Sequence, residues 1–181
     1  MCSRIGVSVI KRRDQVLDSF LEDIRELYDN GGAFLSGFDI SPDSVFDWFA
    51  SRNRLSEDGL LDSLLLNPAV RNALPDIYGN AGQKIETGLA FYDPFMLDGV
   101  LSRILYYGGA YSKNEGDGRA EKAFAIHVCE AMFESRFGEV SCYLTHKAWS
   151  SWFKDVAWDL TVAVFDRRTR RLWILATTDT D

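Results

Sequence analysis

Four acidic residues recur one helical turn apart near the beginning of the chain: Asp14, Asp18, Glu22 and Glu26. On a helix this spacing places the carboxylates along one face, where each like-charged pair costs about 0.2–0.5 kcal/mol. Because the pattern works against the helix that carries it, we predict that these residues form a binding stripe for a basic protein partner. The alternative is a solvated helix face that is compensated by Arg25 and by the Arg12 and Arg13 pair.

Histidines and cysteines form a second group, which superficially resembles a structural zinc pattern: His127, Cys129, Cys142 and His146. On a helix, positions 127 and 129 point roughly 200° apart, so they cannot both ligate one tetrahedral ion. We therefore assign no metal here and expect core or capping roles. His127 and Glu130 do share a helix face, and could serve as a base and its orienting carboxylate for a cysteine nucleophile. An ordinary helical pair is the alternative.

Three carboxylates come together at the end of a predicted β-hairpin over residues 158–181: Asp159, Asp179 and Asp181. If the turn centres on Arg168 and Thr169, Asp159 lies opposite Thr178. Three converging carboxylates could bind Mg²⁺ or Ca²⁺, whereas a threonine and aspartate network that closes the sheet is the alternative.

Basic and aromatic clusters flank the same hairpin. The four arginines of the turn, at positions 167, 168, 170 and 171, could bind phosphate or an acidic patch, or they could form a solvated loop. Trp149, Trp152 and Phe153 fall on one face of a predicted helix over residues 147–156, and they could either pack in the core or anchor a homodimer.

The elements that would position these residues follow from periodicity. Residues 5–10 are predicted to form a short strand or an extended arm, and residues 140–145 a strand. Apolar stripes and stop signals predict helices over residues 14–29, 42–52, 57–66, 68–74, 94–107 and 119–136, the last of them central in the core. Residues 85–92 fit a strand or a helix equally. The fold class is therefore α+β: the first two-thirds of the chain is rich in helices and packs on a small antiparallel sheet that includes the C-terminal hairpin.

Composition narrows the class of protein. With 181 residues, 46% of them hydrophobic, the chain can bury one core, so a single globular domain is expected over residues 1–181. The net charge is -7, and residues 1–100 hold 16 acidic and 9 basic side chains, so the whole acidic excess lies there. A negative field argues against nucleic-acid binding. Irregularly spaced cysteines and the lack of a long apolar run argue against disulfides and membrane insertion, so we expect a cytoplasmic protein.

These observations favour a non-enzymatic, acidic protein-interaction domain without a cofactor, whose general profile is similar to that of bacterial immunity proteins and antitoxins. The alternative is a small-ligand-binding or metal-dependent hydrolytic enzyme that uses His127 and Glu130, or the Asp159, Asp179 and Asp181 group. The sequence has no nucleophile elbow, Walker loop or H-E-x-x-H motif, so no catalytic residue is assigned.

Overall fold

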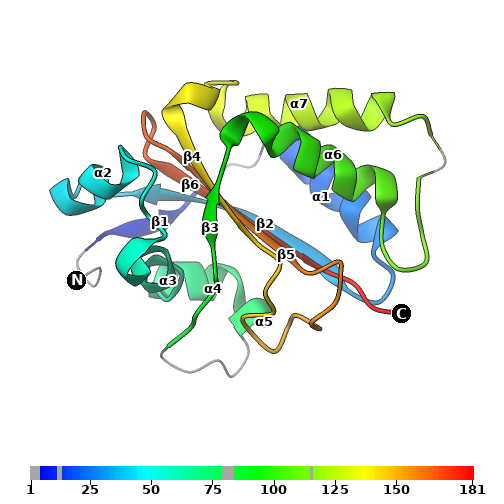
Figure 1. The fold of residues 1–181 in the computed structure, drawn as a ribbon, viewed down its shortest axis with the longest axis horizontal. Helices are drawn as coiled ribbons and strands as arrows, with labels where there is room; N and C mark the ends of the chain where they lie inside the picture. The colour runs from blue at the N-terminus through cyan, green and yellow to red at the C-terminus, as the bar shows by residue number, and fades with distance from the viewer. Residues whose placement is uncertain (1–4, 12–13, 79–83, 115) are drawn as a thin grey trace.

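A six-stranded antiparallel sheet forms the centre of the computed structural model, which describes residues 5–11, 14–78, 84–114 and 116–181 (Figure 1). The strands lie in the order β1-β2-β6-β5-β4-β3, so the C-terminal hairpin of β5 and β6 occupies the middle of the sheet. Their bounds are β1 Val7–Val9, β2 Gly32–Ile40, β3 Ala90–Tyr92, β4 Val140–Thr145, β5 Leu160–Asp166 and β6 Arg171–Thr178.

Seven α-helices of the described residues cover the two faces of this sheet (Figure 1). One face carries α1 (Gln15–Leu27), α6 (Leu97–Tyr107) and α7 (Arg119–Phe133). The other carries α2 (Ser44–Ala50), α3 (Leu60–Leu65), α4 (Pro68–Ala73) and α5 (Pro75–Tyr78). Short 3-10 turns precede α3, α6 and β4: η2 (Glu57–Gly59), η3 (Pro94–Met96) and η4 (Phe137–Glu139). The fold is α+β, with its sheet between two helical layers.

Side chains of the hairpin point alternately to the two faces of the sheet and pack into two separate hydrophobic cores. Val162 and Val164 of β5 and Leu175 of β6 pack under α1, α6 and α7. Ala163 and Phe165 face the opposite layer of helices. Since both faces of each strand are buried, the hairpin must be an interior element, as its sequence predicts.

Several predicted elements are confirmed. Helix α1 begins at Asp14, whose carboxylate accepts a hydrogen bond from the Val16 N–H at 2.8 Å, and it buries its predicted apolar stripe, including Phe20 and Ile24. The hairpin has the predicted register, in which Leu160 pairs with Thr177 and Asp166 with Arg171. Residues 85–92 contain the short edge strand β3.

Other predictions were wrong. Strand β2 was missed because Gly37 interrupts its apolar pattern; an added Cβ at Gly37 would lie 2.5 Å from the Trp173 ring. Helix α2 begins later than expected because Asp43, rather than Ser41, caps it. Helix α7 is not buried all round, since Ile126 is 47% exposed.

The segment over residues 147–156 is not a helix. Its Lys154 and Val156 N–H groups donate to the Asp159 carboxylate at 3.1 and 3.2 Å, and Asp155 has a φ of 58°. A side chain that takes up backbone donors competes with helix formation. The aromatic residues nevertheless pack in the core as expected, with Trp149 donating from Nε1 to Thr161 Oγ1 at 2.9 Å. Within the described residues, no helix is long and apolar enough to cross a membrane.

Candidate functional site: an acidic face and groove on helix α1

The predicted acidic stripe lies on the outer side of α1. Asp14, Glu22 and Glu26 are exposed, whereas Asp18 is half-buried. Asp18 lines a groove of about 450 Å³ that also reaches Asn72 and Trp173, and Glu26 lines a different groove. The four residues therefore follow one side of α1, with Asp14 at its N-cap, but Asp18 and Glu26 line different grooves.

Compensation by neighbouring arginines was the alternative explanation of the stripe. The Arg25 Nε instead donates to the Ala33 carbonyl at 3.0 Å, and its guanidinium lies 5.9 Å from the centre of the Phe34 ring. Arg25 is thus held against β2. The Arg12 and Arg13 pair lies outside the described residues.

Asp23 is an acidic residue that the four-residue spacing did not single out. It is exposed, and its carboxyl pKa is raised by partial burial and by repulsion from Glu26 and Glu22. The i,i+3 spacing of Asp23 and Glu26 was the available sequence signal. Among the described residues, no ion pair involves Glu22, Asp23 or Glu26.

Beside Asp23 and Glu26, residues of α1, α6 and α7 line a groove of about 410 Å³. Glu121, in the first turn of α7, lines its wall and is only 7% exposed. One carboxylate oxygen, Oε1, accepts a hydrogen bond from Asn114 Nδ2. The other, Oε2, is buried and has no hydrogen-bond partner among the described residues. A buried polar atom that lacks a partner costs about 1–3 kcal/mol, so this oxygen is a ready acceptor for a donor that enters the groove.

The groove combines charge with apolar surface. Three carboxylates line it, those of Asp23, Glu26 and Glu121. Its apolar lining consists of Leu27, Leu105, Ala120 and Phe124. This arrangement suits a ligand that carries a positive charge at the end of an aliphatic chain.

The histidine and cysteine candidates do not form a nucleophilic site. His127 and Glu130 are both exposed on the outer face of α7, whereas Cys129 and Cys142 are fully buried beneath it. Burial raises the pKa of each thiol to about 12, so both remain protonated and unreactive at neutral pH. His146 lies elsewhere, with Nδ1 2.8 Å from the Asp159 carbonyl oxygen.

The three carboxylates at the hairpin end do not converge. Asp159 is buried and accepts a hydrogen bond from Thr178 Oγ1 at 2.5 Å. Asp179 follows Thr178 in the chain, at a position that belongs to the opposite face of the sheet. Its carboxylate accepts hydrogen bonds from the Asn30 and Ala110 N–H groups at 2.9 and 2.7 Å. Asp181 is exposed. Among the described residues, no three His, Cys, Asp or Glu side chains are placed to hold a metal ion. The expected alternative, a closing network of threonine and aspartate, is what the contacts form.

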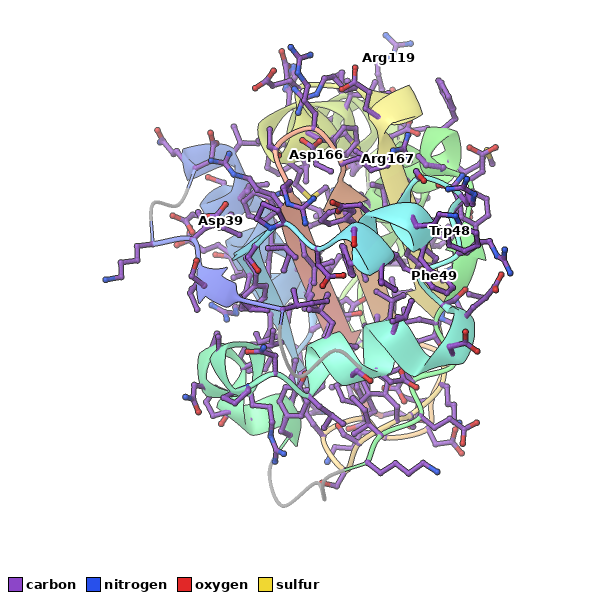
Figure 2. The ribbon with its side chains drawn as sticks, turned by 90° about the vertical axis from the view of Figure 1, so that its left-hand side faces the viewer. Asp39, Trp48, Phe49, Arg119, Asp166 and Arg167 are labelled. Carbon is purple, nitrogen blue, oxygen red and sulfur yellow. The ribbon has the colours of Figure 1, made fainter. Side chains whose placement is uncertain are left out.

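The arginine-rich turn is also committed to internal contacts. Figure 2 shows Asp166 and Arg167 at the end of the hairpin that faces α2, which carries Trp48 and Phe49. Arg167 donates to the Val140 carbonyl and to Ser141 Oγ, both at 3.1 Å. These contacts tie the turn to β4, so this part of the turn is not the solvated loop that the sequence suggested.

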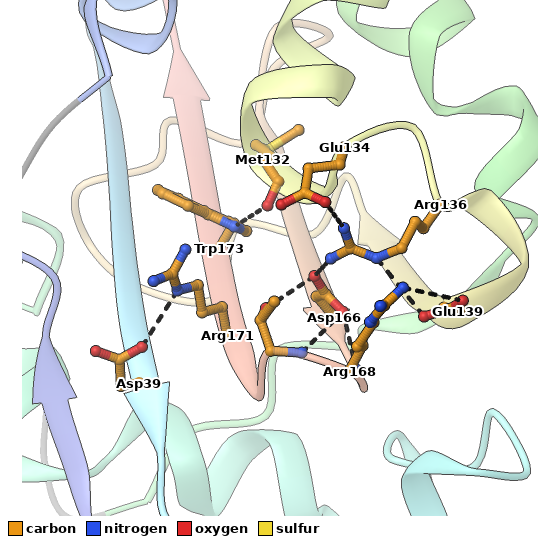
Figure 3. Close-up of polar contacts among 10 residues, drawn as sticks. Asp39, Met132, Glu134, Arg136, Glu139, Asp166, Arg168, Arg171 and Trp173 are labelled. Atoms are coloured by element: carbon orange, nitrogen blue, oxygen red, sulfur yellow. Dashed lines mark hydrogen bonds and ion pairs between the residues drawn. The ribbon is translucent and has the colours of Figure 1, made fainter.

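A charged network fixes the same turn to the end of α7 (Figure 3). Asp166 is fully buried and forms an ion pair with Arg136, which also lies beside Glu134 and, at 3.6 Å, Glu139. The Asp166 carboxylate additionally accepts from the Arg168 N–H at 2.9 Å. Because its charges are paired within the chain, this network is a structural feature.

The fold is α+β, and the comparison with known families adds a partial match. Residues 125–181 match a family described as "Family of unknown function (DUF6183)". The matched segment runs from within α7 through β4, β5 and β6, and so contains the charged network of the turn. Helix α1 and Glu121 lie outside it. No curated protein matches the chain.

Proposed function

We propose that this chain is a protein-interaction domain that binds a basic partner through the outer face of α1, here called the acidic face: Asp14, Glu22, Asp23 and Glu26, with Asp18 at its edge. The observation that carries the proposal is that three of these carboxylates have no ion-pair partner among the described residues. Glu22, Asp23 and Glu26 form no ion pair with a described residue, and Arg25 is held against β2.

Repulsion among the carboxylates of this face lowers the stability of the folded chain. Partial burial raises the pKa of the Asp23 carboxyl, and repulsion from Glu26 and Glu22 raises it further, so the ionised carboxylates of this face repel one another. A basic partner would relieve that repulsion on binding, and complementary charge would also speed association. The acidic excess of residues 1–100 extends the same field over the first part of the chain.

The test uses a fluorescently labelled peptide of alternating lysine and alanine, titrated with the full chain and followed by fluorescence anisotropy. We expect binding that weakens steeply with salt, because the contact is electrostatic. The double variant Glu22→Lys and Glu26→Lys should lose binding. The matched control is the double variant Glu86→Lys and Glu130→Lys, which changes two exposed glutamates elsewhere and alters the net charge equally. This control should retain most of the peptide binding.

Equal loss of binding in both double variants would show that only net charge matters, and would contradict the proposal. Circular dichroism of each variant checks that the fold is intact, which is expected because Glu22 and Glu26 are exposed.

A further inference from the structure

We infer that the groove between α1, α6 and α7 binds a lysine side chain of the basic partner. This inference rests on the proposed function for the source of the lysine. The groove and the acidic face are continuous, because Glu26 belongs to both and Asp23 lies beside it.

The acceptor inside the groove is one carboxylate oxygen, Glu121 Oε2. Glu121 is 93% buried, with Oε1 occupied by Asn114 and Oε2 lacking a partner among the described residues. A buried carboxylate oxygen without a donor gains more from an entering ammonium than an exposed one does, because it has already lost its water. The groove therefore holds a prepared acceptor, in addition to its negative charge.

The geometry favours lysine over arginine. An arginine guanidinium is a planar fork that pairs best with both oxygens of one carboxylate. Glu121 offers only one oxygen. A lysine ammonium is a compact charge with three donors, which suits single oxygens contributed by separate side chains: Glu121 from α7, and Asp23 and Glu26 from α1.

The walls of the groove match the rest of the side chain. Leu27, Leu105 and Phe124 supply apolar surface along which the four-carbon stem of lysine can lie while its charge meets the carboxylates. A bare metal ion would gain nothing from these walls, and no group of three metal-ligating side chains is found in the described parts of the chain.

The test is a nuclear magnetic resonance titration of the ¹⁵N-labelled full chain with N-acetyl-lysine methylamide. We expect saturable shifts of the backbone amides around Glu121 and Phe124. The norleucine analogue, which keeps the stem and lacks the charge, should bind at least about tenfold more weakly, as a charge-assisted hydrogen bond predicts. The arginine analogue should also bind more weakly than lysine.

Variants of the chain test the named acceptor. Glu121→Gln keeps the shape and removes the charge, so it should weaken binding of the lysine analogue by about tenfold or more. Asp23→Asn, at an exposed position that does not endanger folding, should weaken it less. Glu130→Gln, on the outer face of α7, should leave binding unchanged.

The outcomes separate this inference from the proposed function. If the labelled peptide binds the acidic face but the lysine analogue causes no shifts, the groove inference fails and the proposed function stands. Shifts at the groove without peptide binding would support the groove inference and contradict the proposed function. Tighter binding of 1,5-diaminopentane than of the lysine analogue would identify a site for free amines and overturn the assignment to a partner's side chain.

Discussion

Neutralising the acidic face should make the protein more stable, although it removes the proposed binding site. In the double variant Glu22→Gln and Glu26→Gln, three repulsive pairs disappear: Asp18 with Glu22, Glu22 with Glu26, and Asp23 with Glu26. At about 0.2–0.5 kcal/mol for each pair at i,i+3 or i,i+4 spacing, the expected gain is about 0.6–1.5 kcal/mol at low ionic strength. Glu26 adds to this because it lies in the last turn of α1, where the helix dipole disfavours negative charge.

Urea unfolding followed by circular dichroism measures this gain directly. For a chain of this size it corresponds to a rise in melting temperature of about 2–4 °C per kcal/mol. The difference between variant and natural chain should shrink in about 0.5 M salt, because exposed charges are then screened. Glu130→Gln is the control for the same chemical change on another exposed helix face. A variant that is no more stable than the natural chain would show that the carboxylates are already compensated.

Three further predictions concern the hairpin and the core. Asp159→Ala should lower the free energy of unfolding in urea by about 3 kcal/mol, because it leaves two backbone donors and a threonine unpaired. The control Asp181→Ala should change it by less than about 0.5 kcal/mol. Equal effects of the two variants would contradict the closing network. Arg136→Met should cost about 3–5 kcal/mol, since it leaves the buried Asp166 charge unpaired, and a loss below about 1 kcal/mol would refute that role. Burial raises the pKa of the Cys129 thiol to about 12, so between about pH 9 and pH 12 the folded chain keeps a proton that the unfolded chain releases. The free energy of unfolding should therefore fall as the pH rises through this range, and it should fall less steeply in Cys129→Ala. Parallel stability profiles of the variant and the natural chain would contradict the burial of this thiol.

The interior hairpin could be predicted because its information is local. Two apolar runs and a short turn set the register, and that register places Asp159 opposite Thr178 as observed. The strand β2 could not be predicted in the same way. Gly37 weakens the pattern of the strand, and the reason for it is the Trp173 ring, which packs against it from a residue 136 positions later in the chain.

The candidate site was predictable in part. The four-residue spacing identified Asp14, Asp18, Glu22 and Glu26, and the structure places three of them on the surface. Glu121 could not have been found, because in the sequence it is an ordinary acidic residue in the first turn of a helix. Its burial, and the lack of a described partner for its Oε2, arise only when α7 packs beside α1 and α6.

The most direct measurement of the central claim is a map of where a basic ligand binds. Nuclear magnetic resonance titration of the full chain with the lysine and alanine peptide should shift the amides of Glu22, Asp23 and Glu26, together with those lining the groove. Shifts centred instead on the Asp166 turn, or spread evenly over the surface, would contradict the assignment of the acidic face as the binding site.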